Sequence, residues 1–383
     1  MRIAFIVGRF PVISETFILN QIAGLIDKGN DVDIYAFQGK PIEQTDKVHP
    51  IVERYQLLDR THYPAKNAEN YIDSVVETHA SMFEGKKPYD IIHCQFGPFG
   101  VMAMRLRQAG IIEGKLITNF RGFDISRHLQ EYGEDIYEEL FKQGDLFLAN
   151  CEFFSQRAIK LGCAPHKILV HGSGIDCDKF TFTPRYLPDD RIVRVATVGR
   201  FVEKKGLEYA IRAIAKVVQK YPKLEYHLIG DGHLREQFEN LIKELEIEPF
   251  VILHGWKEQR EIVEILDRCQ LFVAPSVTAP DGNQDAPVNT LKEAMAIGLP
   301  VIGTLHGGIP ELVEEGISGF LVPEKDPESI ASKLSYLIEH PQLWPDMGKA
   351  GRDRVKEKYN MNMLNKELYE LYQKLTRSKQ LIA

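Results

Sequence analysis

The sequence predicts an α/β protein built from two doubly wound domains, each with a parallel sheet. Its 383 residues exceed what one ordinary hydrophobic core holds, so two domains of common size are expected. Short apolar runs alternate with helical patterns along the whole chain, which is typical of repeated βα units. A polar stretch with two prolines and no periodicity, residues 176–191, separates two such series and is interpreted as a linker.

The first series occupies residues 1–175. It opens with an apolar run at 2–7 that indicates a buried parallel strand. Residues 15–28 follow with apolar positions at helical spacing, and Gly29 ends this helix. Further strands are expected at 31–37, 91–94, 115–119, 146–149 and 168–171.

The second series occupies residues 192–359 and repeats the same architecture. Its strands are expected at 193–198, 225–229, 251–254, 271–274 and 301–303. The chain then ends in a helical stretch within residues 360–383, centred on 362–375. Two parallel-sheet domains and a terminal helix are therefore predicted.

Composition excludes several classes of protein. The chain is 44% hydrophobic and 26% charged with a net charge of -7, which does not indicate a nucleic-acid-binding module. Five scattered cysteines without a C-x-x-C pair favour reduced thiols in the cytoplasm over disulfides or a zinc site. No apolar segment approaches the ~20 residues that span a bilayer, and the first apolar run is too short for a signal peptide.

The most informative stretch is residues 281–311, D-G-N-Q-D-A-P-V-N-T-L-K-E-A-M-A-I-G-L-P-V-I-G-T-L-H-G-G-I-P-E. A polar loop with Asp285 runs into a helix that carries Glu293 about two turns in and stops at Gly298. Free N–H groups at a helix start favour an anion, and a carboxylate such as Glu293 accepts hydrogen bonds from ring hydroxyls. Phosphate and sugar hydroxyls together indicate a sugar nucleotide. The alternative is a surface helix capped by Asp285.

A second motif, G-R-F-V-E-K-K-G, follows the strand at 193–198. Gly199 admits close backbone approach, and the fork of Arg200 with the point charge of Lys205 suits a diphosphate. Lys204 is expected on the surface, where all of these basic residues would lie if the loop has no function. No D-x-D metal motif follows a strand, and neither G-x-G-x-x-G nor a P-loop occurs, which weakens a dehydrogenase or NTPase interpretation.

These two motifs, with G-L-P-V-I-G and G-G-I-P-E in order behind them, resemble the family-4 retaining glycosyltransferases. That family is marked by E-x7-E, and Asp285 stands here in place of the first glutamate. The resemblance implies the GT-B fold, with two facing Rossmann-like domains, an interdomain cleft and a C-terminal helix crossing back to the N-terminal domain. It makes residues 1–175 the acceptor side and residues 192–359 the nucleotide-sugar side.

The resemblance also implies roles for single residues of the second domain. Arg200 and Lys205 would hold the diphosphate, and Glu293 the ribose hydroxyls. Asp285 would position the transferred sugar together with the backbone of Ala286, Pro287, Val288 and Asn289. Gly230 and Gly232, in L-I-G-D-G-H, and Gly255, in H-G-W-K, would let the backbone contact the nucleotide. A plain β-turn explains G-D-G equally well, and core packing explains Trp256 as well as stacking does.

In the first domain, Gly8 would admit a loop that approaches the diphosphate and acceptor. D-I-I-H-C-Q-F-G resembles the family's H-x-H-F-G, which makes His93 a candidate catalytic residue with Gln95 at the second histidine position. N-F-R-G-F-D resembles the family's H-G-x-D, with Arg121 in place of histidine and Asp124 retained. Arg121 would hold a phosphate and Asp124 would orient it or a sugar hydroxyl, whereas a structural role for His93 remains equally open.

The function implied is retaining transfer of a sugar from a nucleoside diphosphate sugar to an acceptor hydroxyl. A UDP-hexose is favoured over a GDP-sugar, and no metal or other cofactor is required. Within the family, the chain most resembles enzymes of exopolysaccharide or other cell-surface polysaccharide assembly, which implies a cytoplasmic location. The acceptor could be lipid-linked, with peripheral membrane contact through basic residues: Arg105, Arg107 and Lys115. The alternative is that these residues lie on an ordinary solvated helix face. Two rival functions remain, a GT-B nucleotide-sugar epimerase and a catalytically silent sugar-nucleotide-binding protein.

Overall fold

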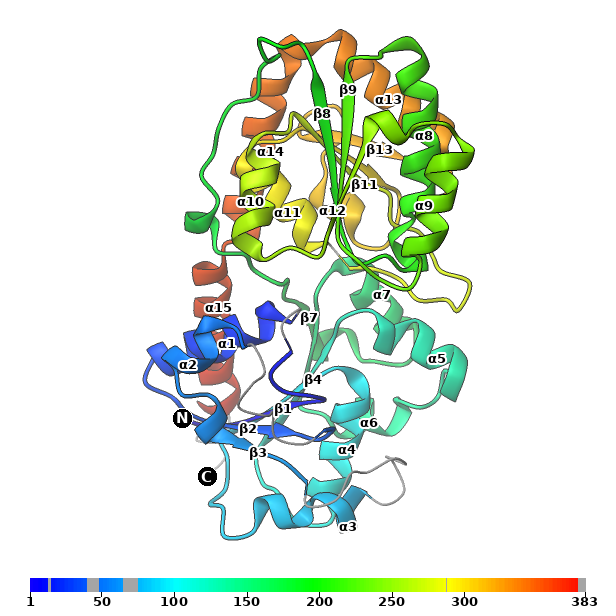
Figure 1. The fold of residues 1–383 in the computed structure, drawn as a ribbon. Helices are drawn as coiled ribbons and strands as arrows, with labels where there is room; N and C mark the ends of the chain where they lie inside the picture. The colour runs from blue at the N-terminus through cyan, green and yellow to red at the C-terminus, as the bar shows by residue number, and fades with distance from the viewer. Residues whose placement is uncertain (13–14, 40–47, 65–74, 287, 378–383) are drawn as a thin grey trace. The chain divides into compact units, whose positions relative to one another are not determined.

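The computed structural model describes residues 1–12, 15–39, 48–64, 75–286 and 288–377. The chain forms two compact units, Met1–Gly174 with the C-terminal residues from Met361, and Ile175–Asn360. Each unit is a parallel sheet with helices on its faces (Figure 1). The α/β class and the two parallel sheets predicted from the sequence are confirmed.

The first unit contains a seven-stranded sheet in the order β3-β2-β1-β4-β5-β6-β7. All of its recorded strand pairs are parallel. The strands are β1 Arg2–Val7, β2 Asp31–Ala36, β3 Thr61–His62, β4 Ile91–Gln95, β5 Lys115–Phe120, β6 Leu146–Ala149 and β7 Ile168–Val170. The central strands are buried along nearly their whole length, as continuous apolar runs predict for a sheet covered on both faces.

Helices of the first unit connect these strands. They are α1 Thr16–Asp27, α2 Pro50–Arg54, α3 Val75–His79, α4 Gly97–Gln108, α5 Arg127–Tyr132, α6 Glu138–Gln143 and α7 Glu152–Lys160. The last helix of the chain, α15 Met361–Arg377, belongs to this unit and lies beside α1 (Figure 1). Leu368 and Tyr372 of α15 join the apolar core with Ile18 and Ile22 of α1. The return of the terminal helix to the first unit is therefore confirmed.

The second unit contains a six-stranded sheet in the order β10-β9-β8-β11-β12-β13. Its strands are β8 Val193–Val198, β9 Leu224–Ile229, β10 Val251–Gly255, β11 Leu271–Ala274, β12 Val301–Thr304 and β13 Gly319–Val322. Its helices are α8 Leu207–Lys220, α9 Arg235–Glu244, α10 Gln259–Asp267, α11 Asn289–Ile297, α12 Ile309–Leu312, α13 Pro327–Glu339 and α14 Trp344–Lys358. Because all recorded pairs are parallel, the carboxyl ends of these strands meet at one edge of the sheet.

The stretch interpreted as a linker, 176–191, packs on the second unit. Phe180 is 2% exposed and lies in the core of that unit with Leu291 and Met295. Arg185 donates to the carbonyl oxygen of Asp267 at 2.5 Å. These contacts make the stretch part of the second unit rather than a freely solvated connection.

The membrane-facing surface considered for α4 is absent from the described structure. Val101, Met102 and Leu106 are all buried, so this helix offers no apolar face to lipid. Arg107 and Lys115 both pair with Asp145 at 2.7 Å. In the part of the chain that the structure describes, no helix is both long and apolar enough to cross a bilayer.

Candidate active site

The densest group of predicted site residues lies at the carboxyl edge of the second sheet. Strands β8 and β11 are neighbours there, and the segments that follow them supply the group. Arg200 and Lys205 follow β8, Asp285 lies in the loop between β11 and α11, and Glu293 lies on α11. Ligands of doubly wound proteins bind at this edge, so the fold places these residues where such a site is expected.

Asp285 lies between two lysines. Its Oδ2 is 2.7 Å from Nζ of Lys205 and its Oδ1 is 3.0 Å from Nζ of Lys204. Burial alone would raise the pKa of Asp285, but the two ammonium groups hold it well below its usual range. Burial conversely lowers the pKa of Lys205, an effect that Asp285 opposes. Lys204 was expected on the surface, and that expectation is wrong, because its side chain is 14% exposed and ion-paired.

Arg200 differs from the two lysines because its side chain is exposed. Among the described residues, no hydrogen-bond or ion-pair partner is found for its guanidinium. It is nevertheless near enough to Lys205 for its charge to contribute to the lowered pKa of that lysine. The cluster thus combines a solvated guanidinium with two ammonium groups neutralised by one carboxylate, which leaves a net positive charge for an anionic ligand.

The backbone and carboxylate of Asp285 are held from several sides. Ser276 Oγ donates to Oδ2 at 3.1 Å, and the Asp285 N–H donates to His306 Nε2 at 2.9 Å. Gly307 has a φ of +51°, and a Cβ there would lie 2.0 Å from the Asp285 carbonyl oxygen. Only glycine therefore lets the turn after β12 approach Asp285 this closely.

Glu293 is half-buried on α11, about one turn beyond the first residue of the helix, Asn289, and not the two turns expected from the sequence. Burial raises its pKa to about 7, while Gln259 and Lys292 act in the opposite direction. Gln259 Nε2 lies 3.4 Å from its Oε1. A half-buried carboxyl with so few partners is poised to accept hydrogen bonds from a ligand.

The start of α11 presents backbone N–H groups. Val288 precedes the first helical residue and supplies no side-chain cap, so the first-turn N–H groups have no side-chain acceptor from that position. The Asn289 side chain accepts a hydrogen bond within the same helix, from Lys292 Nζ to its Oδ1 at 3.1 Å. Ala286 is half-buried, whereas Pro287 lies outside the described residues. The helix N-terminus predicted to face an anion is thus next to Asp285 in the chain.

The predicted glycines of this edge have a clear packing reason. Gly230 has a φ of +142°, and a Cβ there would lie 1.9 Å from the Gly199 carbonyl oxygen. Gly232 would meet the Phe201 carbonyl oxygen at 2.5 Å, and Gly255 accepts from the Gly230 N–H at 2.9 Å. The turns after β8, β9 and β10 are therefore packed backbone on backbone. Trp256, beside them, is 58% exposed and is not a core residue.

In the first unit, Arg121 is the centre of a buried polar network. It follows β5 and is 7% exposed. Its Nε donates to Gln95 Oε1 at 2.5 Å, its Nη1 to Ser173 Oγ at 2.9 Å and its Nη2 to Gln21 Oε1 at 3.2 Å. Burial lowers its pKa to about 10. Its guanidinium is thus held by neutral acceptors, and it also lies over the Phe17 ring at 4.2 Å.

Asp124 and Gly8 follow strand ends of this unit, whereas His93 lies in the middle of β4, which continues to Gln95. Asp124 is fully buried and accepts from the N–H groups of Gly97, Arg121 and Gly122 at 2.8–3.0 Å. His93 is fully buried, and its Nδ1 shares a hydrogen bond with the Tyr372 hydroxyl of α15. Burial holds the pKa of His93 well below its usual range. A Cβ at Gly8 would lie 2.8 Å from the Phe99 ring, so packing favours glycine there.

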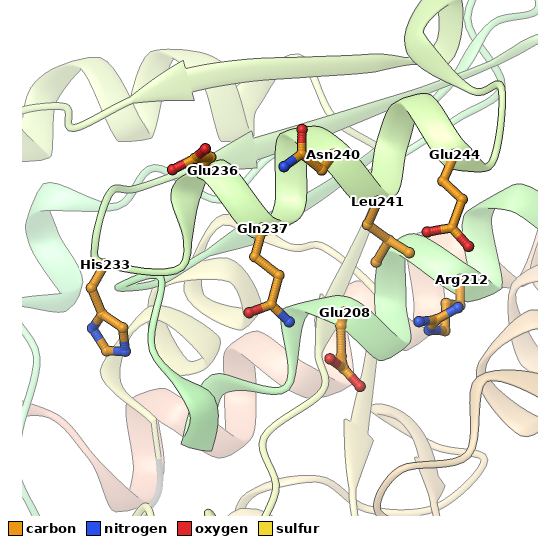
Figure 2. Close-up of a pocket in the computed structure, with 8 residues that line it drawn as sticks. All are labelled: Glu208, Arg212, His233, Glu236, Gln237, Asn240, Leu241 and Glu244. Atoms are coloured by element: carbon orange, nitrogen blue, oxygen red, sulfur yellow. The ribbon is translucent and has the colours of Figure 1, made fainter.

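A separate hollow lies on the outer face of the second unit. Figure 2 shows the side chains that line it, all from α8, α9 and the turn before α9. They are Glu208, Arg212, His233, Glu236, Gln237, Asn240, Leu241 and Glu244. The volume of the hollow is about 520 Å³. No described residue of the strand-end cluster lines it, so it is distinct from the candidate site.

Sequence reasoning missed three residues that shape the cluster: Lys204, His306 and Glu324. His306 belongs to the quoted stretch 281–311, but its role depends on a neighbouring strand that the sequence does not reveal. Glu324 follows β13, which is only four residues long and was not predicted. Across the described residues, no group of three or more His, Cys, Asp or Glu side chains is arranged to hold a metal ion.

Known proteins resemble this chain along nearly its whole length. Residues 14–179 match the family described as Glycosyltransferase Family 4, and residues 181–354 match Glycosyl transferases group 1. The amylovoran biosynthesis glycosyltransferase AmsK of Erwinia amylovora is 34% identical over 98% of this chain and 100% of its own. WcaL of Escherichia coli strain K12, a glycosyltransferase assigned to colanic acid biosynthesis, is 33% identical over 98% of this chain and 100% of its own.

Solved structures share the fold. Sucrose-phosphate synthase from Thermosynechococcus elongatus superimposes with a TM-score of 0.79 at 19% identity, covering 99% of this chain and 100% of its own. Anabaena Alr3699/HepE, solved in complex with UDP, gives 0.76 at 20% identity, covering 98% and 100%. At such low identities these likenesses concern the fold, whereas the two full-length relatives and the two family matches settle the family. The chain belongs to the group 1, family 4 glycosyltransferases.

Proposed function

We propose that this protein is a retaining glycosyltransferase that uses a nucleoside diphosphate sugar as donor. The observation that carries this is the convergence of Arg200, Lys204 and Lys205 beside the start of α11, with Glu293 inside that helix. Three cations and a helix N-terminus suit a diphosphate, and a half-buried carboxyl suits the hydroxyls of a ribose.

The cluster would act mainly on the leaving group. As the bond from the anomeric carbon to the phosphate oxygen breaks, its electron pair passes to the departing nucleoside diphosphate. Arg200 and the two lysines would stabilise this growing charge, which is where electrostatic catalysis has its largest effect. No metal ion or other cofactor enters the proposed reaction.

The acceptor would attack on the face that the diphosphate leaves. A bond forms between the acceptor oxygen and the anomeric carbon, and the acceptor proton passes to the leaving phosphate oxygen. The anomeric configuration is then kept without a protein nucleophile. The role of Asp285 is to keep Lys204 and Lys205 in place and, with the Ala286 and Val288 backbone, to orient the transferred sugar.

The first unit is proposed to serve the acceptor. Arg121 and Asp124 lie where β5 ends, beside Gly97 at the start of α4, and Asp124 holds the Gly97 and Arg121 N–H groups, so an acceptor group bound there would meet a fixed cation. His93 is enclosed by Gln95 and Tyr372, and its proposed catalytic role requires that this network open. A glycan acceptor, lipid-linked or free, fits the proposal.

Donor class and pathway are proposed from the relatives. WcaL and AmsK carry names of colanic acid and amylovoran biosynthesis, so we infer exopolysaccharide assembly for this chain. HepE has been solved with UDP and with UDP-glucose, which favours a UDP-hexose here over a GDP-sugar. We infer work on the cytoplasmic side, where nucleotide sugars are available.

The test is thermal unfolding of the purified protein against UDP, GDP, ADP and dTDP and their common sugars, with and without EDTA. A ligand at about 100 times its Kd adds roughly 2.7 kcal/mol of stability. We expect one nucleotide to stabilise selectively, with no effect of EDTA. A shift abolished by EDTA would overturn the metal-free site. No shift with any nucleotide would favour a catalytically silent scaffold protein. In a separate assay, release of a rearranged sugar without acceptor would favour an epimerase.

A further inference from the structure

His306 and Glu324 form a hydrogen-bonded pair behind the strand-end cluster. His306 follows β12 and is fully buried, and Glu324 follows the neighbouring strand β13. The register pairs Thr304 with Val322, so the two segments leave the sheet side by side. His306 Nδ1 lies 2.6 Å from Glu324 Oε1.

The proton on the His306 ring is fixed by its partners. A backbone N–H only donates, so the 2.9 Å contact from the Asp285 N–H makes His306 Nε2 an acceptor. The ring proton must then lie on Nδ1 and is donated to Glu324. A second proton on the ring would set Nε2–H against the Asp285 N–H and break this contact.

Glu324 also binds Thr278, near the start of the loop between β11 and α11 that contains Asp285. Its Oε2 accepts from the Thr278 N–H at 2.7 Å, and its Oε1 accepts from the Thr278 hydroxyl at 3.3 Å. Burial would raise the pKa of Glu324, but the Thr278 N–H and His306 lower it below its usual value, so the carboxyl is ionised. The loop from β11 to α11 is therefore anchored at Thr278 directly and at Asp285 through His306.

The strand-end cluster beside the His306–Glu324 pair is strongly charged. Asp285 pairs with Lys204 and Lys205, and Glu324 pairs with the His306 ring. In the described structure the hydrogen bonds of the His306 ring go to the Asp285 N–H and to Glu324, so Asp285 connects His306 to the two lysines.

We propose that His306 and Glu324 act as positioning residues, which set Asp285 and thereby the two lysines for the diphosphate of the donor. The inference rests on the proposed function, because it assigns the lysines to that diphosphate. His306 accepts from the Asp285 backbone N–H, whereas Ser276, Lys204 and Lys205 all contact the Asp285 carboxylate. Losing the acceptor frees the Asp285 N–H and lets its carboxylate and both lysines move.

The test uses three variants of the full chain: His306→Phe, which keeps a ring without nitrogen acceptors, His306→Gln, which keeps an acceptor near the Nε2 position, and Glu324→Gln. His166→Phe is the control, because His166 is exposed in the first unit. Hydrogen–deuterium exchange over residues 276–286 reports the anchoring, and titration with inorganic diphosphate reports the lysines.

We expect the His306→Phe variant to exchange its amide hydrogens faster over residues 276–286. It should also bind diphosphate at least about tenfold more weakly, because misplaced binding groups lower the affinity by such factors. His306→Gln should recover most of both properties. In turnover, KM for the donor should rise more than kcat falls. Unchanged exchange and diphosphate affinity in His306→Phe would overturn the inference. If the unmodified protein binds no diphosphate, the proposed function fails instead, while the exchange data still decide the anchoring.

Discussion

The ammonium nitrogen of Lys205 lies 2.7 Å from Oδ2 of Asp285, and the same carboxylate holds Lys204 at 3.0 Å. The first acid of the D-x7-E pattern is therefore ion-paired with two lysines and is not exposed to solvent as a free carboxylate. A shorter side chain than glutamate suffices for this because the loop after β11 brings the Asp285 backbone against Gly307 and His306.

Replacing Asp285 by Asn should destabilise the second unit. The change leaves Lys204 and Lys205 close together without a counter-charge in a mostly buried place. Breaking such a pair from one side should cost about 2–4 kcal/mol here, at the low end of what buried pairs show. Chemical unfolding of the two proteins measures this, and added inorganic diphosphate should restore part of the loss by returning negative charge.

Asp189→Asn is the matched control, since Asp189 is exposed in the segment before β8. It should change stability by no more than about 0.5 kcal/mol. Equal stabilities of the Asp285 and Asp189 variants would contradict the view that Asp285 neutralises the lysines.

Glu293 predicts a pH-dependent stability. Its pKa is raised from 4.5 to about 7, so the folded protein binds a proton that the unfolded chain releases between these values. Stability linked to Glu293 is therefore full below about pH 4.5 and is lost as pH rises to about 7. Glu293→Gln removes the penalty, and we expect it to gain about 1–2 kcal/mol at about pH 8 and almost nothing at about pH 4. Unfolding at the two pH values checks this, and an equal effect at both would contradict it.

The same carboxyl should release a proton when the donor binds. Hydroxyl donors from a ribose favour the ionised form and lower the pKa of Glu293. Below about pH 7, binding should therefore expel protons, and affinity should rise with pH. Calorimetry of nucleotide binding in two buffers of different ionisation enthalpy measures this, with the Glu293→Gln variant as the comparison that loses the proton release.

Gly307→Ala tests the close approach of two backbone segments. The added Cβ would meet the Asp285 carbonyl oxygen at 2.0 Å, so either the turn after β12 or the Asp285 loop must move. We expect a loss of about 1–3 kcal/mol and weaker nucleotide binding. Gly316→Ala is the control, because Gly316 also has a positive φ, +74°, but nothing within 4 Å. Nucleotide affinity lost equally in both variants would show that backbone strain alone is responsible.

Much of the fold could be predicted because the central strands are continuous apolar runs. The bounds expected for 2–7, 146–149, 193–198 and 271–274 agree with β1, β6, β8 and β11. Two strands were missed. β3 has two residues, too few for any periodicity, and β13, Gly319–Val322, has only three apolar residues after its glycine; both are defined by pairing with a neighbour.

The site was predictable where a motif carries its own chemistry and not where tertiary contacts decide. Arg200, Lys205, Asp285 and Glu293 are indicated by residue type and spacing, and the fold gathers them at one edge. Lys204 looked like part of a surface run, and its pairing with Asp285, far away in the sequence, turns it inward. His306 and Glu324 are joined by strand order, which no local pattern reveals.

Arg200 offers the most direct test of the central claim, because it can be removed without touching the fold. It is exposed, so Arg200→Ala should leave stability within about 0.5 kcal/mol. Loss of one donor to the leaving diphosphate should lower the rate by on the order of 10²–10³. Lys223→Ala is the matched control, a cation removed just before β9, at the opposite edge of the same sheet.

The measurement is release of nucleoside diphosphate from the preferred nucleotide sugar by the unmodified protein and both variants, with unfolding recorded alongside. The account predicts a loss of turnover in Arg200→Ala alone, with all three proteins equally stable. Turnover by Arg200→Ala equal to that of the unmodified protein would contradict the assignment of the strand-end cluster to the diphosphate.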